Sequence, residues 1–278
     1  MIVQKNNSKD WEYRKGDIKM GVLDRFDMND KVSIITGGAR GLGFGIATGL
    51  GEAGSTIIIA DYNIEGSEKA AKELKSMGIS ATAIKLDVTD REHCESVIKE
   101  VVEKYGKIDA LVNNAGINCH VEFENMTDEE WHRVLAVNLD GVFNMCQFVG
   151  KQMIKQGKGS IINIASMNGI VATYPQTISS YNTSKAGVIM LTKSLAIEWS
   201  KKGIRVNAIA PGFVETELTK KKWHDPTSEF VKSMLARIPI GRRATIDEMA
   251  PLALFLASEA SSYATGAVFV IDGGYTAI

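Results

Sequence analysis

A tyrosine and a lysine in this sequence have the spacing that proton transfer requires. Tyr181 and Lys185 stand four positions apart in YNTSK, at the start of a helical pattern, and residues i and i+4 share one helix face. A free phenol titrates at about pH 10, too high for base catalysis at neutral pH, but a neighbouring ammonium group lowers this pKa by stabilising the phenolate. Such a pair alone also fits an ordinary protein surface. In an active site it predicts a phenol that takes the proton of an alcohol.

A serine hydroxyl is expected near that phenol. Ser166 directly follows Ile161–Ala165, a largely apolar run that reads as a buried strand. A hydroxyl at the carboxyl end of a strand can hydrogen-bond a substrate oxygen as charge develops on it, although serine is also a common turn or cap residue. Ser166 is therefore a candidate for orienting a substrate beside Tyr181.

A glycine-rich segment predicts a site for phosphate groups. Gly37, Gly41 and Gly43 lie in TGGARGLG (36–43), after an apolar run and at the start of a helical pattern. The first glycine permits a tight turn, the second lets the backbone approach a pyrophosphate, and the third lets the helix pack closely on the strand. Free N–H groups of the first helical turn then face the phosphates. Because the spacing is GxxxGxG rather than GxGxxG, the segment alone also fits a structural turn.

An acidic residue follows this loop at the spacing of a ribose-binding acid, about 20 residues on. Asp61 ends the next apolar run, where its carboxylate can accept hydrogen bonds from both hydroxyls of an adenosine ribose. A carboxylate there repels a 2′-phosphate, whereas Arg40 in the loop would attract one. Asp61 also suits a helix N-cap. The sequence predicts NAD as the cofactor, with NADP as the weaker alternative.

Short apolar runs alternate with helical patterns from about residue 31 onward. Strands are expected at Lys31–Thr36, Ser55–Ala60, Ala81–Leu86, Ala110–Val112, Ser160–Ile164, Ile204–Ile209 and Ala267–Ile271. Helices are expected up to residue 53, over 64–77, up to 105, and over 127–156 and 181–201. This alternation predicts one α/β domain, a Rossmann-type doubly wound parallel sheet of about seven strands with helices on both faces. Residues 28–278 would form it, and the polar residues 1–27 an extension.

The composition argues against several classes of protein. Lys plus Arg number 32 and Asp plus Glu 33, a balance that indicates no surface for nucleic acid or anionic membranes. No apolar run is long enough for a membrane span. The 3 cysteines form no CxxC pair and the 4 histidines show no metal-ligand spacing, which argues against disulfides and a metal site. A cytoplasmic protein is expected.

In their order and spacing, these segments resemble the short-chain dehydrogenase/reductase family over about residues 28–277. The motifs that carry the resemblance are TGGARGLG (36–43), Asp61, LDV (86–88), NNAG (113–116), VNLDG (137–141), Ser166, YNTSK (181–185), RVNAIAPG (205–212) and DGG (272–274). Each motif is weak alone, and the set is specific. The resemblance implies an oxidoreductase that transfers a hydride between NAD(H) and a secondary alcohol or ketone.

The resemblance also implies roles for individual positions. Tyr181 would be the general acid/base, Lys185 would lower its pKa and bind the nicotinamide ribose, and Ser166 would polarise the substrate oxygen. Asn138 would anchor a water molecule that links Lys185 to a proton relay. Cofactor contacts are expected at Gly37, Arg40, Gly41, Leu42, Gly43, Asp61, Asp87, Val88, Asn114, Ala115, Gly116, Tyr181, Lys185, Pro211, Gly212, Val214 and Thr216.

Three segments are expected to line the substrate pocket. They are Asn118–Glu122, Met167–Ile178 and 213–230, and the last, with Lys220–Lys222, Trp223 and His224, has the length of a lid. Candidate substrate-binding residues are Ser166, Tyr181, His120, Asn168 and Gln176.

The substrate itself is left open between three classes. The pattern of polar residues resembles gluconate 5-dehydrogenases and the sorbose and xylulose reductases, which favours a polyol, sugar or sugar acid. Apolar residues such as Met167 and Phe213 would also suit a hydroxysteroid. A 3-oxoacyl carrier protein is the third candidate, disfavoured by Asp61 because such family members tend to use NADPH.

Two further expectations concern turnover and assembly. A non-catalytic NAD-binding redox sensor is the alternative of a different class, and the complete set Asn138, Ser166, Tyr181 and Lys185 argues against it. The resemblance implies a homotetramer, a dimer of dimers, with the helices at 127–156 and 181–201 on the dimer face.

Overall fold

Seven parallel strands form one sheet in the computed structural model, which describes residues 20–216, residue 225 and residues 228–278. The strands are β1 (Val32–Thr36), β2 (Thr56–Asp61), β3 (Ala81–Lys85), β4 (Ala110–Asn113), β5 (Gly159–Ile164), β6 (Ile204–Pro211) and β7 (Val268–Ile271). Their order is β3-β2-β1-β4-β5-β6-β7, and every neighbouring pair is parallel. The predicted doubly wound sheet is confirmed, and its order reverses between β1 and β4, where such folds bind ligands.

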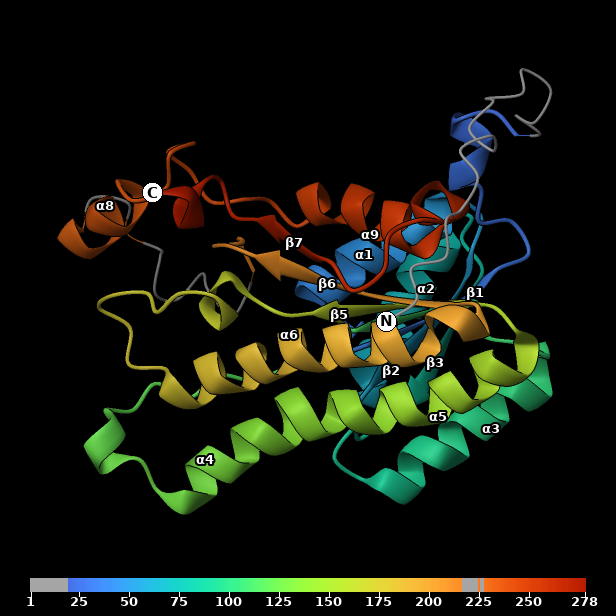
Figure 1. Cartoon of the computed structure of the whole chain (residues 1–278), viewed down its shortest axis with the longest axis horizontal. Helices are drawn as coiled ribbons and strands as arrows, with labels where there is room; N and C mark the ends of the chain where they lie inside the picture. The colour runs from blue at the N-terminus through green and yellow to red at the C-terminus, as the bar shows by residue number, and fades with distance from the viewer. Residues whose placement is uncertain (1–19, 217–224, 226–227) are drawn as a thin grey trace, which may run out of the picture.

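Helices cover both faces of this sheet (Figure 1). They are α1 (Gly41–Glu52), α2 (Ile64–Ser76), α3 (Arg91–Tyr105), α4 (Asp128–Leu135), α5 (Gly141–Gln156), α6 (Ser179–Trp199), α8 (Glu229–Leu235) and α9 (Ala250–Ala257). Successive strand residues point to opposite faces: Ile34 packs in a core with α3, α5 and α6, and Ile35 in a second core with α1, α2 and α9. The described helices are too short or too polar to cross a membrane.

The helical pattern predicted over 127–156 contains a break in regularity. Thr127 and Glu130 form a capping box that starts α4, and Gly157 in the left-handed conformation ends α5. Between the two helices, Ala136–Asp140 form a π-helical turn. Such turns often occur at functional sites, and this one contains the predicted catalytic residue Asn138.

Helix α9 was not anticipated from the sequence. Its eight residues, APLALFLA, are apolar on nearly every side and therefore give no 3.6-residue period. The helix packs directly on α1, where a Cβ added to Gly49 would lie 2.7 Å from Ala250 Cβ.

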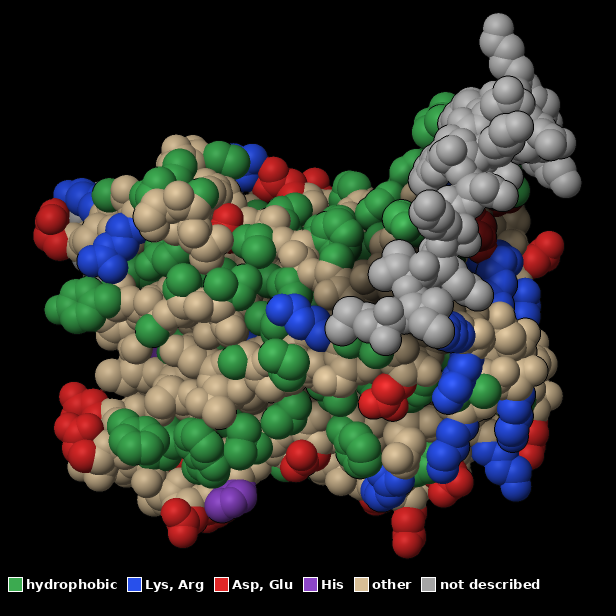
Figure 2. Space-filling model, viewed as in Figure 1, with side chains coloured by type: hydrophobic (Ala, Val, Ile, Leu, Met, Phe, Trp, Pro, Cys, Tyr) green, Lys and Arg blue, Asp and Glu red, His purple; other side chains and the backbone are tan. Residues whose placement is uncertain are grey.

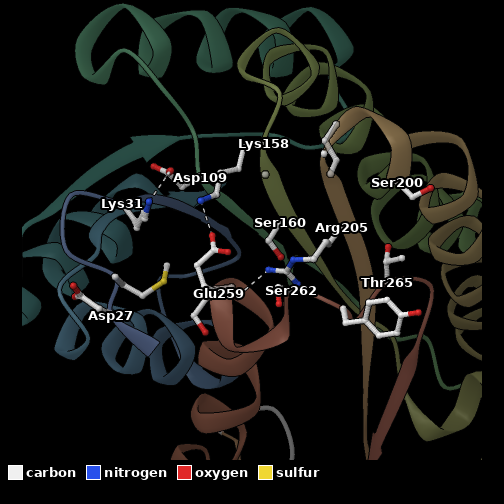
Figure 3. A pocket seen from close by; sticks show the side chains of 17 residues that line it. Asp27, Lys31, Asp109, Lys158, Ser160, Ser200, Arg205, Glu259, Ser262 and Thr265 are labelled. Atoms are coloured by element: carbon white, nitrogen blue, oxygen red, sulfur yellow. Dashed lines mark hydrogen bonds and ion pairs between the residues drawn. The ribbon is translucent and has the colours of Figure 1, made fainter. Parts of the chain in front are cut away.

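A cavity of about 620 Å³ opens at the amino ends of the strands, away from the expected site (Figure 3). Its basic groups are already engaged within the protein. Lys31 pairs with Asp109 at 3.7 Å, Lys158 pairs with Glu259 at 2.5 Å, and the Arg205 guanidinium donates to Ser261 and to two carbonyl oxygens. The first contact joins the start of β1 to the start of β4, and the other two fasten β5 and β6 to α9 and the segment after it.

Candidate active site

The predicted proton-transfer pair lies together on α6. Lys185 Nζ is 5.7 Å from the centroid of the Tyr181 ring, because one helical turn separates the two residues. Ser166, just beyond β5, is close enough to the Tyr181 phenol to favour its phenolate form, and its Oγ accepts a 3.1 Å hydrogen bond from Asn168 N. The fold therefore brings Ser166, which the sequence placed after a strand, next to the pair that it placed on a helix.

Burial governs the titration of both α6 groups. Burial raises the pKa of Tyr181 above its ordinary value, and the Ser166 hydroxyl opposes this by stabilising the phenolate. Burial also lowers the pKa of Lys185 to about 8. At neutral pH the phenol is protonated and suited to give a proton to a ketone oxygen; taking a proton from an alcohol requires more positive charge nearby. The predicted lowering of the Tyr181 pKa by Lys185 stays a prediction.

Asn138 fastens the segment after β4 to α6. From the π-helical turn, its Oδ1 accepts from Ile117 N at 2.8 Å and its Nδ2 donates to Ile117 O at 2.9 Å and to Ser184 Oγ at 3.1 Å. An added Cβ on Gly116 would lie 3.4 Å from Asn138 Oδ1 and 3.6 Å from Lys185 Nζ. Gly116 thus marks the place where the two polar side chains converge, beside the cleft described next.

A cleft of about 780 Å³ lies at the carboxyl ends of β1, β2 and β4. Eleven of the predicted cofactor residues line it: Gly37, Arg40, Gly41, Leu42, Asp61, Asp87, Val88, Asn114, Ala115, Gly116 and Thr216. Residues that the sequence analysis did not single out also line it, namely Ala60, Tyr62, Asn63, Leu86, Thr89, Ile117, Arg133, Ala136 and Val137. Leu86 and Val137 belong to the LDV and VNLDG motifs without a predicted contact, and the others lie outside the predicted motifs.

The glycine loop leaves backbone groups open to this cleft. Gly37 and Gly41 have φ of 62° and 56°, values that other residues rarely adopt. Helix α1 begins at Gly41 without a side-chain cap, so its first N–H groups are available to an anion. Gly37 has no room for a side chain, since a Cβ there would lie 2.9 Å from Ala115 Cα.

Asp61 stands at the end of β2, on the rim of the cleft. Its Oδ2 accepts from Ala39 N at 3.2 Å and its Oδ1 from Asn63 N at 3.0 Å, which holds the carboxylate between the glycine loop and the start of α2. The site fits a dinucleotide: the loop and α1 would hold the pyrophosphate, Asp61 the adenosine ribose, and Lys185 the nicotinamide ribose. When bound, the nicotinamide accepts or supplies the hydride.

Contacts behind and beside the cleft involve Asn114, which lines it, and several predicted cofactor residues that do not line it. A Cβ on Gly43 would lie 2.4 Å from Gly37 O, so this glycine lets α1 approach the loop. Asn114 Nδ2 donates to Thr36 O at 3.0 Å and Gly37 O at 2.9 Å, which fixes the loop from β4. Gly212 N donates to Ile271 O at 3.0 Å. Pro211 ends β6, and Val214 forms a bridge with Ala244; their cofactor contacts stay predictions.

The structure describes two of the three segments that were expected to line the substrate pocket, and part of the third. Asn168 and Gln176 both hydrogen-bond Thr173 Oγ1, in the loop between Ser166 and Tyr181. His120 is exposed in the segment after Gly116. From the predicted lid, Lys220–Lys222, Trp223 and His224 lie outside the described residues.

Comparisons with known proteins agree with this geometry. A family model described as Enoyl-(Acyl carrier protein) reductase matches residues 37–276, and a short-chain type dehydrogenase/reductase structure from Mycobacterium marinum superposes with a TM-score of 0.88 at 37% identity, covering 93% of this chain and 100% of that one. The chain belongs to the short-chain dehydrogenase/reductase family. As a member of that family it is an NAD(P)-dependent oxidoreductase that acts on CH–OH groups.

Similar family members differ in what their names say they act on. The chain is 44% identical to a 3-oxoacyl-[acyl-carrier-protein] reductase of Thermotoga maritima, over 89% of this chain and 98% of that protein. It is 40% identical to a D-threitol dehydrogenase of Mycolicibacterium smegmatis, over 90% and 95%. A gluconate 5-dehydrogenase from Burkholderia cenocepacia, in complex with NADP and tartrate, has a TM-score of 0.87 at 38% identity, covering 93% and 100%.

Proposed function

We propose that this short-chain dehydrogenase/reductase interconverts a secondary alcohol and its ketone on a polyol, sugar or sugar acid, with NAD(H) as the preferred cofactor. One observation carries the substrate class: the two amide side chains of Asn168 and Gln176 lie in the loop that joins Ser166 to Tyr181. Amides bind hydroxyl groups well. Similar family members named as D-threitol, galactitol and glycerol dehydrogenases support the same class.

The NAD preference rests on Asp61. Its carboxylate is held at the rim of the cleft by two backbone N–H groups. A fixed negative charge there repels a 2′-phosphate and accepts hydrogen bonds from ribose hydroxyls. Arg40 lines the same cleft, and it is the residue expected to take over if the phosphate-bearing cofactor binds better.

A second candidate activity is reduction of a 3-oxoacyl carrier protein. It is favoured by the 44% identity to the Thermotoga maritima reductase. The two amides of the Ser166–Tyr181 loop favour the polyol instead, since an acyl chain has no hydroxyl beyond the reacting oxygen for them to bind. The proposed order is therefore polyol or sugar acid first and acyl chain second.

The test is the absorbance of NADH on mixing the protein with NAD and a panel of polyols and sugar acids, with NADP in parallel. Steady turnover with NAD on the panel supports the proposal. Turnover only in the reductive direction with a 3-oxoacyl thioester supports the second candidate. Binding of NAD without turnover on any substrate, in either direction, would support a redox sensor.

Cofactor choice is tested separately with Asp61→Ala. Removing the carboxylate is expected to shift the ratio of kcat/KM for NADP over NAD by at least tenfold, about 1.4 kcal/mol. Asp128→Ala, which alters an exposed acid at the start of α4, is the control and should leave the ratio unchanged. An unchanged ratio in Asp61→Ala would contradict the role given to this residue.

We also propose a homotetramer. Apolar side chains are exposed along α5 and α6, where Phe143 is 43%, Met190 60% and Ile197 81% exposed; Figure 2 shows hydrophobic side chains over these two helices. Strand β7 is an edge strand of the sheet and leaves Val270 43% exposed. Two such surfaces would give a dimer of dimers, and light scattering of the purified protein would give its mass.

A cytoplasmic location is proposed from the cysteines. All 3 of them, Cys94, Cys119 and Cys146, are free and buried. Unpaired thiols are typical of proteins in reducing compartments.

A further inference from the structure

A single hydroxyl group joins the two amide side chains of the Ser166–Tyr181 loop. Thr173 Oγ1 receives a hydrogen bond from Asn168 Nδ2 at 3.1 Å and another from Gln176 Nε2 at 3.0 Å. The turn is closed by a backbone hydrogen bond from Gln176 N to Thr173 O at 2.9 Å. Thr173 is only 2% exposed. Its side chain therefore holds the loop together from within and is not accessible to a ligand.

The loop is fastened to the catalytic elements on one side. The backbone N–H of Asn168 donates to Ser166 Oγ at 3.1 Å, which places residue 168 next to Ser166. Gly169 lies directly against α6, since a Cβ there would be 2.7 Å from the carbonyl carbon of Lys185. The position of Asn168 is therefore tied to the positions of Ser166 and Lys185.

The loop is fastened on its outer side as well. After α8, Arg237 Nη1 donates to Tyr174 O at 3.0 Å, and its guanidinium carbon lies 5.5 Å from the centroid of the Tyr174 ring. Tyr174 directly follows Thr173. The segment that carries the Thr173 hydroxyl is thus held between the catalytic helix and the segment after α8.

The chemistry of a hydroxyl decides how the amides face. A hydroxyl has one hydrogen and two lone pairs, so at least one of two amides bonded to it must present its NH₂ group to it. In this structure both do. Each amide consequently turns its carbonyl oxygen away from Thr173, and these oxygens can accept hydrogen bonds from the hydroxyls of a substrate.

We propose that Thr173 is a specificity-determining positioning residue that orients Asn168 and Gln176 as a pair of acceptors for a substrate with two or more hydroxyl groups. This rests on the proposed polyol or sugar-acid function and narrows it to substrates that carry free hydroxyls beside the reacting carbon. A substrate with a single hydroxyl gains nothing from the pair.

The test compares Thr173→Val with Thr173→Ser. Valine has nearly the shape of threonine without the hydroxyl, and serine keeps the hydroxyl. The wild type is first assayed with NAD on D-threitol, xylitol and D-gluconate, and the variants on the substrate it turns over best. Thr173→Val should raise KM about tenfold, the effect of one net hydrogen bond, with kcat and the Kd for NAD changed little. Thr173→Ser should restore KM to within about twofold.

The outcomes separate the two proposals. If the wild type turns over none of the three compounds, the proposed function fails and the role of Thr173 with it. If the wild type is active but KM in Thr173→Val equals that of wild type, only the role of Thr173 is overturned. A parallel fall in kcat, NAD affinity and Tm in both variants would also overturn it, because it would mark Thr173 as a packing residue.

Discussion

The Lys185 ammonium group donates a 2.7 Å hydrogen bond to the carbonyl oxygen of Ile164, the last residue of β5. This contact joins α6 to the strand that leads into Ser166, two residues further on. It also holds a cation at a site where Lys185 is only 4% exposed. Burying this charge costs stability, and the hydrogen bond to Ile164 O offsets part of that cost.

This burial predicts a pH-dependent effect of Lys185→Met on stability. The pKa of Lys185 is about 8 in the folded protein, against an ordinary value of 10.5. Between these values the unfolded chain still holds the proton that the folded protein has lost, so wild-type stability gains from this group as pH rises. The free energy of unfolding of wild type minus that of Lys185→Met should increase by about 3 kcal/mol from pH 7.5 to 10.5.

Urea unfolding of both proteins at several pH values measures this difference, in which other titrating groups cancel. A difference that stays constant with pH would show that Lys185 is not destabilised by burial. The same variant should have little activity, since it removes the cation from the site.

Tyr181→Phe should remove turnover and leave cofactor binding intact. The change deletes the phenol that exchanges the proton and keeps the ring that packs near Lys185. Loss of a general acid/base lowers kcat by about 10² to 10⁴. Tyr105→Phe is the matched control, because Tyr105 hydrogen-bonds Thr82 at 2.8 Å, away from the catalytic residues. Equal kcat values for Tyr181→Phe and wild type would remove Tyr181 from the mechanism.

Two glycines near the cleft should respond differently to alanine. In Gly43→Ala the new Cβ would meet the Gly37 carbonyl oxygen at 2.4 Å and Asn114 Nδ2 at 2.5 Å, so the backbone of the loop must move. We expect a loss of about 1–3 kcal/mol in the free energy of unfolding and weaker NAD binding. In Gly116→Ala the nearest atom lies at 3.4 Å, so stability should change much less. Thermal unfolding of both variants tests the contrast, and equal losses would contradict it.

Arg237→Ala should weaken substrate binding without changing cofactor binding. The change removes the hydrogen bond to Tyr174 O and the guanidinium near the Tyr174 ring, neither of which touches the cofactor cleft. We expect KM for the alcohol to rise several-fold while the Kd for NAD, measured by fluorescence titration, stays the same. Lys232→Ala is the control, because Lys232 is an exposed base in α8 that pairs with Glu229. A shift in NAD affinity in Arg237→Ala would show that Arg237 supports the cleft instead.

Much of the site followed from local sequence. The glycine loop, Asp61 and the Tyr181–Lys185 pair are each defined by residue types at fixed spacing within one strand, turn or helix. Parallel strands align their carboxyl ends, so the strand pattern also predicted that Ser166 and the glycine loop would share one edge of the sheet. The short helix α9 was not predicted, because its residues are apolar on nearly every side and show no 3.6-residue hydrophobic period.

The sequence by itself determined the sheet, the glycine loop and the candidate Tyr181–Lys185 pair, because strand alternation, helical periodicity and glycine conformations are properties of neighbouring residues. Only the tertiary structure decided that Arg237 reaches Tyr174 across 63 positions, that Asn114 holds Thr36 across 78, and that Asn138 binds Ile117 through a π-helical turn. Contacts of this kind depend on how whole elements pack. The orientation of two amides around Thr173 is of the same kind, since it depends on which hydroxyl the folded loop places between them.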